Sequence, residues 1–466
     1  MPRDLTTRFM VLLPLVFSLG CSRAAADNPV AAAELGDLVA ASKHIQKSST
    51  YCATVSRGYD LSDFLGVTVA FEIYDPSIYP SLIQRLRQLG VSHVRIPIHW
   101  WYLEPVKGKI DPVFIMRLDT AMRVLRSSGI QVVMYFSGST PWNTTDGKGL
   151  SDRYPPASFV DYVERANWLA DRYKDLEGIQ IWNEPNTPGF WAPREQPRRY
   201  SELLAQAYDR LKAAHPTLHI GAAGMAYYSN MPFEKGLMLE ALARLGSFKK
   251  CDSLAYHPYF ATPEGSDPVD EPGDFIRTAS WLNTQLRALG ARRIWASEWG
   301  WSTYPGPVEE QPIISYQQQA DYILRRLSLF LGLDFDRVYL FDLADFPAGW
   351  KGRDANYGMI TNDDREKVSF KALRYFRQVV GEHVAPAAMP PIEVDRKRLY
   401  CTVVKRKRGE TLLLIWAGTT RKCRIPGVKR LIVHNPLKQA SKEVVCSDGG
   451  EFTVTPWLQL VELHYK

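Results

Sequence analysis

The chain has 466 residues, of which 45% are hydrophobic and 23% are charged, and its formal net charge is +7. These values are typical of a folded soluble protein and exclude a chain that is too polar to build a core. The length suits one large domain with a small companion better than one continuous core.

The first 26 residues have the pattern of a secretory signal peptide, and we expect an extension over residues 27–60 to follow them. Arg3 and Arg8 precede a short apolar run at residues 9–17. This run is much shorter than the roughly 20 residues that span a bilayer. The sequence therefore predicts an exported protein, for which nucleic acid is not an expected partner.

Two endings of this leader remain open. Cys21 after Gly20 resembles the cleavage site of a bacterial lipoprotein, whereas the three alanines at residues 24–26 suit an ordinary signal peptidase. The first ending predicts a membrane tether through a lipidated Cys21, in the periplasm or at the outer membrane. The second predicts a protein that is free in the periplasm or secreted.

Six cysteines are present, and no CxxC or Cys/His spacing indicates zinc. Cys401, Cys423 and Cys446 lie near the end of the chain, where an oxidising compartment would permit one disulfide, but the sequence does not give the pairing. The acidic residues of the loop at 262–274 lack the spacing of an EF-hand, and we expect them to be solvated. We predict no metal and no cofactor.

Residues 61–384 alternate short apolar runs with longer amphipathic stretches. The eight runs are residues 64–70, 91–96, 130–136, 179–182, 219–223, 253–256, 293–297 and 337–341. Eight strand–helix units predict a (β/α)₈ TIM barrel as the α/β catalytic domain. The alternative, an open doubly wound sheet, would usually show a Gly-rich phosphate loop after its first strand, and this sequence has none.

Residues 385–466 show only strand patterns after a proline-containing linker, and they predict a small C-terminal β-sandwich. The expected strands are residues 399–404, 411–416, 431–433 and 457–463. Strands that precede the barrel are further candidates for this sheet. Residues 391–466 contain 15 lysines and arginines against 7 aspartates and glutamates. This basic surface is either simply solvated or a contact for anionic glycans or headgroups.

The strongest motif is Trp182-Asn183-Glu184-Pro185 at the end of the fourth predicted strand, and Ser297-Glu298-Trp299-Gly300 ends the seventh. Side chains at the carboxyl ends of barrel strands face the mouth where substrates bind. Strands four and seven lie opposite each other, so the two Glu residues can flank one sugar. Glycoside hydrolysis requires such a pair, because one carboxylic acid protonates the leaving oxygen and one carboxylate attacks the anomeric carbon.

The two motifs resemble those of the clan of retaining glycosidases whose catalytic Glu residues lie on strands four and seven. They are most similar to glycoside hydrolase family 39, and within it to the exported members associated with exopolysaccharide. The resemblance implies that Glu184 is the acid/base and Glu298 the nucleophile. It further implies that Asn183 binds the sugar 2-hydroxyl and that Arg95 lies near the nucleophile, although Arg95 also suits a structural ion pair.

His257-Pro258-Tyr259, after the sixth strand, matches the clan as well. It implies that His257 binds a sugar hydroxyl and that Tyr259 orients the nucleophile, while a structural buried His is the alternative. His99 and Trp100 end the second strand and are further candidates for lining the mouth.

Five tryptophans fall in loops that we expect at the active face, where they either stack on sugars or pack their own loops. They are Trp142, Trp191, Trp299, Trp301 and Trp350. Together they favour several sugar subsites. Asp342 and Asp345 follow the eighth strand, where many relatives have a tryptophan, and Trp350 is the candidate to compensate.

The sequence therefore predicts a monomeric retaining β-glycoside hydrolase that cleaves within an extracellular or cell-envelope polysaccharide. An exo-acting enzyme such as a β-xylosidase has the same fold, and a transglycosylase uses the same glycosyl-enzyme. The alternative from another class is a glycan-binding protein without turnover. The sugar and its linkage are not given by the sequence.

Overall fold

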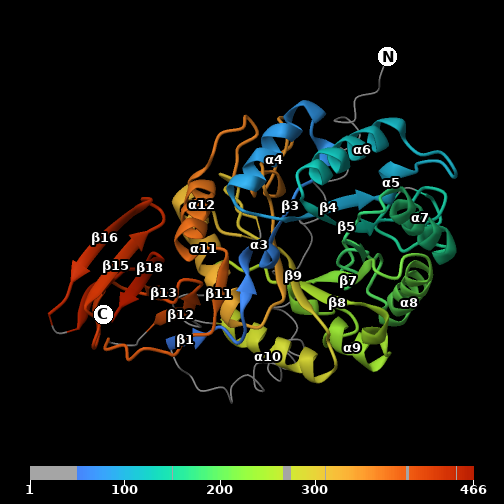
Figure 1. Cartoon of the computed structure of the whole chain (residues 1–466). Coiled ribbons are helices and arrows are strands. Elements are labelled where there is room, and N and C mark those ends of the chain that lie inside the picture. The colour runs from blue at the N-terminus through green and yellow to red at the C-terminus, as the bar shows by residue number, and fades with distance from the viewer. Residues whose placement is uncertain are drawn as a thin grey trace.

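In a computed structural model of the protein, eight parallel strands close into a barrel that is surrounded by helices (Figure 1). The structure describes residues 50–149, 151–265, 274–309, 311–394, 398–447 and 449–465. The predicted signal peptide, Cys21 and most of the predicted extension lie outside these residues. Within the described ranges, no helix is long and apolar enough to cross a membrane.

The barrel strands follow one another around the ring in chain order, and β10 closes the ring against β3 with Val338 opposite Leu65. The strands are β3 (Leu65–Thr68), β4 (His93–His99), β5 (Gln131–Ser137), β6 (Gly178–Ile181), β7 (His219–Ala226), β8 (Ser253–His257), β9 (Ile294–Trp299) and β10 (Arg337–Leu340). Each of the eight apolar runs in the sequence overlaps one of these strands, so the predicted barrel is confirmed and the doubly wound alternative is wrong.

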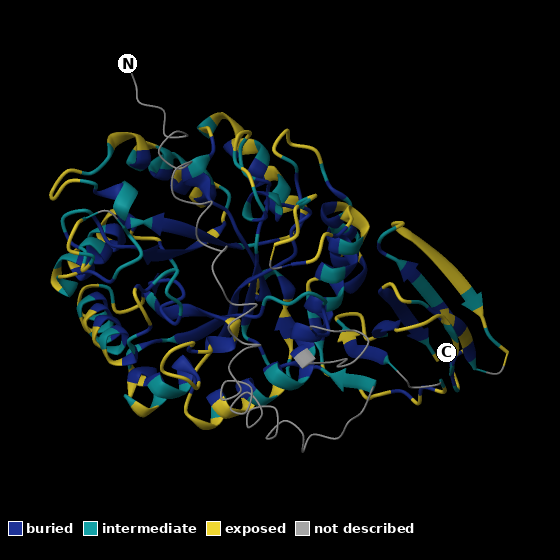
Figure 2. Ribbon diagram, turned by 180° about the vertical axis from the view of Figure 1, so that it is seen from behind, coloured by how far each residue is buried: buried dark blue, intermediate teal, exposed yellow. Residues whose placement is uncertain are grey.

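Each barrel strand is followed by a helix that packs its apolar face on the barrel. These helices are α4 (Tyr79–Gln88), α6 (Pro112–Ser127), α7 (Phe159–Arg172), α8 (Pro197–Ala214), α9 (Met238–Arg244), α10 (Asp274–Ala288), α11 (Tyr316–Gly332) and α12 (Val368–Val380). The described residues also form short helices, which are α3 (Leu61–Phe64), α5 (Trp100–Leu103), η1 (Phe71–Ile73), η2 (Pro76–Ile78), η3 (Tyr227–Ser229), η4 (Ser247–Lys250) and η5 (Asp354–Asn356). The barrel strands are buried on both faces, whereas the outer helices expose one face (Figure 2).

The second domain consists of an eight-stranded sheet that packs against a two-stranded one. The strands are β1 (Thr50–Thr54), β2 (Tyr59–Asp60), β11 (His383–Ala385), β12 (Leu399–Arg406), β13 (Thr411–Ala417), β14 (Arg421–Ile425), β15 (Arg430–Asn435), β16 (Ala440–Val445), β17 (Gly450–Val454) and β18 (Gln459–His464). The large sheet has the order β16-β15-β18-β13-β12-β11-β2, and the small sheet pairs β14 with β17. The predicted β-sandwich is confirmed.

The N-terminal part of the chain completes this C-terminal sheet. β1 pairs in parallel with β12, with Cys52 opposite Cys401, and β2 pairs with β11. The two strands that precede the barrel therefore join the sheet, as the sequence allowed. All five described cysteines are free thiols, so the sheet contains no disulfide between described residues.

The large sheet lies beside α11 and α12 of the barrel (Figure 1), and Glu264 connects the two domains. Its carboxylate accepts a hydrogen bond from Nε1 of Trp416 in β13 at 2.8 Å and one from Nε of Arg325 in α11 at 2.7 Å. Glu264 is only 5% exposed, so the prediction of a solvated loop is wrong for this residue. Its charge is compensated by Arg325, which also contacts Asp321.

We predict that Trp416→Phe lowers the free energy of unfolding by about 1–3 kcal/mol, because the ring packing stays while a buried carboxylate loses one donor. Chemical unfolding followed by circular dichroism measures this value. Trp457→Phe is the matched control, since Trp457 lies in the same domain and is 39% exposed. Equal stability of Trp416→Phe and the wild type would show that Glu264 does not depend on the indole N–H.

Candidate active site

A cleft of about 240 Å³ opens at the carboxyl ends of the barrel strands, which is where substrates bind in this fold. Side chains from the end of every barrel strand line it. Glu184 and Glu298 both face the cleft, and each is 8% exposed. The two predicted carboxylates are therefore brought together in one site.

An unusual backbone turn aims Glu184 into the cleft. β6 ends at Ile181, and both Trp182 and Glu184 have left-handed φ angles, of 76° and 45°. The turn is held by a hydrogen bond of 2.9 Å from the backbone N–H of Glu184 to the carbonyl of Gly224 in β7. Left-handed non-glycine residues are uncommon and cluster at functional sites.

His257, at the end of β8, lies between the two carboxylates. Its Nδ1 is 2.6 Å from Oε1 of Glu184 and 3.8 Å from Oε2 of Glu298, and its Nε2 is 3.0 Å from Oγ of Ser297. The ring has this space because residue 224 is glycine. A Cβ atom at position 224 would lie 2.0 Å from Nε2 of His257.

Glu298, at the carboxyl end of β9, is held by two donors. Nη1 of Arg95 donates to Oε1 of Glu298 at 2.6 Å, and the hydroxyl of Tyr259 donates to Oε2 at 3.3 Å. Arg95 lies inside the barrel, is fully buried, and also donates to Gln180 at 2.6 Å. Both carboxylate oxygens of Glu298 are thus oriented by the protein.

The two carboxylates lie in environments that shift their pKa values in opposite directions. Burial raises the pKa of Glu184, and the charge of Glu298 adds to this effect, although His257 opposes it. Burial alone would also raise the pKa of Glu298, but the charges of His257 and Arg95 outweigh it and leave that pKa below its ordinary value. One group is therefore suited to be a proton donor and the other to be a carboxylate.

Donor atoms of Glu184, His257 and Glu298 all lie within 4.8 Å of one another, so among the described residues this trio could also hold a metal ion. The same atoms are already used in hydrogen bonds. Glu184 contacts His257, and Glu298 contacts the Arg95 guanidinium, which would repel a cation. The contacts fit a pair of working carboxylates better than a metal site.

Asn183 and His99 also line the cleft, as predicted. Oδ1 of Asn183 accepts a hydrogen bond of 3.2 Å from Arg95, so its NH₂ group is the part that can donate to a sugar hydroxyl. Burial lowers the pKa of His99, which favours a neutral ring there. Trp100 is fully buried instead and donates to Glu104 at 2.9 Å, so it supports the wall from behind.

Of the five loop tryptophans, Trp350 lines the cleft. The other four do not line it: Trp191, Trp299 and Trp301 are buried, and Trp142 is half-buried against Trp100. The expectation that these four rings stack on sugars is therefore wrong for this structure. Their large apolar surfaces are used to pack the loops. Besides Trp350, the partly exposed aromatic rings that line the cleft are Phe190, Tyr227, Tyr259, Phe260, Phe341 and Phe346.

The sequence analysis missed two groups that shape the centre of the site. Gln180, in β6, accepts a hydrogen bond from Arg95. Side chains alternate along a strand, so Gln180 points to the opposite side from Ile179 and Ile181. Its position inside the barrel could be inferred from the sequence only after the barrel was assumed. Glu72, just after β3, also faces the cleft. The only signal for Glu72 was a carboxyl side chain at the end of the first predicted strand.

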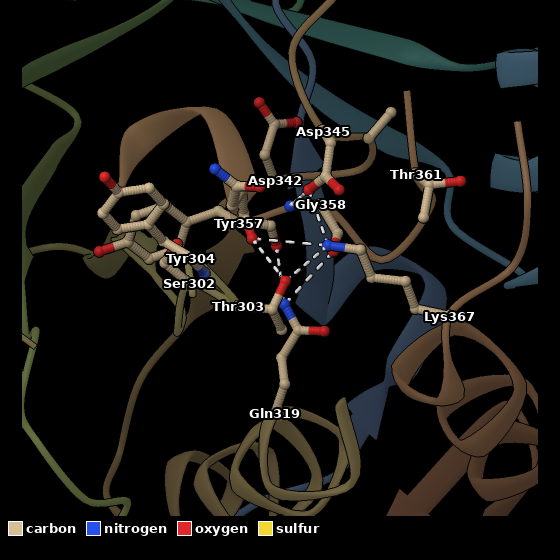
Figure 3. A network of polar contacts seen from close by, with 12 residues as sticks. Ser302, Thr303, Tyr304, Gln319, Asp342, Asp345, Tyr357, Gly358, Thr361 and Lys367 are labelled. Carbon is tan, nitrogen blue, oxygen red and sulfur yellow. Dashed lines mark hydrogen bonds and ion pairs between the residues drawn. The ribbon is translucent and has the colours of Figure 1, made fainter. Parts of the chain in front are cut away.

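A buried ion pair lies in the loop region after β10, to which Trp350 belongs, and Figure 3 shows its partners Lys367 and Asp345. Nζ of Lys367, at the start of α12, donates to Asp345 at 2.7 Å and to Oγ1 of Thr303 at 2.9 Å. Gln319 of α11 donates to the carbonyls of neighbouring residues, including Tyr357 at 3.2 Å. These contacts join the loops after β9 and β10 to the two helices behind them.

No family model matches the chain. A stretch of 150 residues, 32% of this chain, is 31% identical to a β-galactosidase from Thermus thermophilus and covers 20% of that enzyme. The curated relatives that match are thus covered over less than half of their own length.

Solved structures resemble the chain over most of its length. A family 39 glycoside hydrolase from Bacteroides cellulosilyticus WH2 has a TM-score of 0.67 at 16% identity, covering 86% of this chain and 81% of that one. A monomeric β-xylosidase from Caulobacter crescentus CB15 has a TM-score of 0.61 at 16% identity, covering 89% and 99%. The chain has the fold of these glycoside hydrolases. The fold expected from the resemblance to family 39 is confirmed.

We predict that Arg95→Met moves the acidic limb of the pH–activity profile upward by about 1–3 pH units. Without the guanidinium the pKa of Glu298 rises, so a larger fraction of this carboxylate is protonated at low pH. Hydrolysis of an aryl β-glycoside between pH 4 and pH 9 measures the limb. Arg210→Met, which removes an exposed guanidinium paired with Glu164, is the control and should leave it in place. An unmoved limb in Arg95→Met would refute this role.

We predict that Lys367→Met lowers the free energy of unfolding by about 3–5 kcal/mol, because Asp345 is left as a buried carboxylate without its cation. Urea unfolding monitored by tryptophan fluorescence measures the change. Lys351→Met removes an exposed lysine from the same region and should change stability by less than about 0.5 kcal/mol. A similar small effect of both variants would show that the ion pair does not stabilise this loop region.

Proposed function

We propose that the protein is a retaining β-glycoside hydrolase that cleaves within an extracellular or cell-envelope polysaccharide. The observation that carries this proposal is the pair of carboxylates across one cleft, with oxygen atoms of Glu184 and Glu298 within 4.8 Å of each other. Retaining glycosidases have carboxyl groups about 5–5.5 Å apart, whereas inverting enzymes need about 6.5–9.5 Å to accommodate a water.

In the first step, an oxygen of Glu298 attacks the anomeric carbon while the glycosidic C–O bond breaks, and Glu184 gives its proton to the leaving oxygen. In the second step, Glu184 takes a proton from water, whose oxygen attacks the same carbon and releases the Glu298 carboxylate. Two inversions leave the configuration retained. The NH₂ group of Asn183 is placed to bind the sugar 2-hydroxyl, an interaction that strengthens in the transition state.

The endo mode of action is supported by the partly exposed aromatic rings around the cleft, which suit more than one sugar subsite. It has less support than the tryptophan count indicated, since Trp350 is the one loop tryptophan among the five that lines the cleft. An exo-acting β-glycosidase such as a β-xylosidase is the second candidate. The similar structure from Caulobacter crescentus is named a β-xylosidase, and the relative from Thermus thermophilus is named a β-galactosidase.

Export is part of the proposal and rests on the leader pattern of residues 1–26, with a tether at Cys21 as its lipoprotein form. A monomeric state is proposed as well, in line with the similar β-xylosidase, which is described as monomeric.

The test compares wild type, Glu184→Ala and Glu298→Gln on bacterial exopolysaccharides, plant β-glycans and aryl β-glycosides. We expect Glu184→Ala to lose about 10²–10⁴-fold of its rate on polysaccharide, but less on 2,4-dinitrophenyl glycosides, whose leaving group needs no proton. Glu298→Gln should lose turnover of both kinds of substrate. The exposed Glu202→Gln is the control.

Product analysis then separates the remaining alternatives. Proton NMR of the first-formed sugar should show the β-anomer, and an α-anomer would exclude retention. Oligosaccharide products indicate endo action, whereas monosaccharides alone indicate exo action. Full activity in either carboxylate variant would refute the assignment, and binding without cleavage would favour the glycan-binding alternative.

A further inference from the structure

Glu72 has a buried carboxyl group that faces the cleft and is not used by the two-carboxylate mechanism. It lies in η1, directly after β3, and is 3% exposed. Its Oε2 atom has no hydrogen-bond partner among the described residues. Buried carboxyl oxygens are normally hydrogen-bonded, so an unpaired one that faces a binding cleft indicates a missing ligand group.

The surroundings of Glu72 do not provide that group. Arg117 of α6 is the nearby cation, and its Nη1 donates to the main-chain oxygen of Glu72 at 2.8 Å rather than to the carboxyl group. The other titratable groups with an electrostatic effect on Glu72 or affected by it are Tyr74, Tyr79, Tyr135 and Asp342. None of these is a cation.

Asp342 repeats the pattern on the neighbouring strand. It follows β10, which pairs with β3, and it is 1% exposed. One of its carboxyl oxygens accepts from the backbone N–H of Leu343, and the other, Oδ2, has no partner among the described residues. The β3–β10 side of the site thus carries two buried acids, of which Glu72 lines the cleft itself.

Burial favours the neutral form of these two groups. It raises the pKa of Glu72 from 4.5 to about 8 and the pKa of Asp342 well above its ordinary value. A neutral carboxyl group has an O–H that can donate a hydrogen bond, which a carboxylate cannot do. Such a group recognises a hydroxyl oxygen without bringing a further negative charge to the site.

We propose that Glu72 is a substrate-binding residue that donates a hydrogen bond from its carboxyl group to a hydroxyl of the bound sugar, in a cleft that binds an uncharged sugar ring in preference to a uronic acid. This inference rests on the proposed glycosidase function. The guanidinium groups near the cleft are already paired, Arg95 with Glu298 and Arg353 with Asp354. A uronate carboxylate would therefore meet the negative charge of Glu298 without an unpaired guanidinium among the residues described at the cleft, and its desolvation would not be compensated.

The binding test uses the wild type as the parent, because it keeps the pair of Arg95 and Glu298 on which the argument depends. The ligands are 4-nitrophenyl 1-thio-β-glycosides, because their C–S bond resists hydrolysis by a glycosidase. Calorimetry measures the Kd of the thioglucoside and thiogalactoside and of the matched thioglucuronide and thiogalacturonide, which differ only at C6. We expect a neutral glycoside to bind at least about 10-fold more tightly than its uronide. Glu72→Leu in this parent should weaken that binding by about 5- to 150-fold, the range for one lost buried hydrogen bond. Glu72→Gln, which retains a donor, should stay within about 3-fold.

A second measurement reports on Glu72 without any sugar. Its raised pKa means that the folded state binds one more proton than the unfolded state between pH 4.5 and about pH 8, so stability is lost over this range as pH rises. Glu72→Gln removes this loss. Its Tm should match that of the wild type near pH 4.5 and exceed it increasingly up to about pH 8, while Glu202→Gln shows no such trend.

The outcomes separate this inference from the proposed function. Glu72→Leu binding as tightly as the parent, or uronides binding as well as neutral glycosides, would overturn the role of Glu72 and leave the glycosidase intact. A Tm difference that does not depend on pH would overturn the neutral carboxyl group. A wild type that binds none of the four thioglycosides and cleaves nothing in the substrate panel would overturn the proposed function and this inference with it.

Discussion

The guanidinium group of Arg95 is the interaction on which the rest of the site depends. It lies inside the barrel, 3.9 Å from the centre of the Tyr135 ring, and donates hydrogen bonds to Gln180, Asn183 and Glu298. A charge in this position is far from solvent, so salt screens it little. The same cation therefore positions the amide of Asn183 and lowers the pKa of Glu298, so both groups depend on one buried side chain.

Two chemically identical side chains obtain different properties from this arrangement. Glu298 receives the guanidinium and the Tyr259 hydroxyl, whereas Glu184 receives only the ring of His257. Both are equally buried, so burial alone does not distinguish them. The pKa values differ because Glu298, and not Glu184, faces the guanidinium of Arg95. The strand order of the closed barrel determines which of the two carboxylates lies there. β4, which carries Arg95, and β9, which carries Glu298, meet across the barrel interior.

The sequence predicted the fold and the central pair well, because both depend on local patterns. Buried parallel strands are continuous apolar runs, and Glu184 and Glu298 stand in distinctive motifs at two strand ends. The loops were predicted less well. An aromatic ring in a loop has the same sequence pattern whether it packs inward, as Trp191 does, or faces the cleft, as Trp350 does. β16, an exposed edge strand in which half of the residues are polar (Figure 2), has no apolar alternation to detect.

The pairing of β1 with β12 has a consequence for the order in which the protein is assembled. Thr50 lies opposite Leu399, so a strand that is made before the barrel has no partner until all barrel strands have been made. The barrel between them is built from neighbours in sequence and closes from local units, whereas the sheet requires both ends of the described chain at once. Because strands from both sides of the barrel in sequence meet in this sheet, the sheet is completed late in folding, after every barrel strand has been produced.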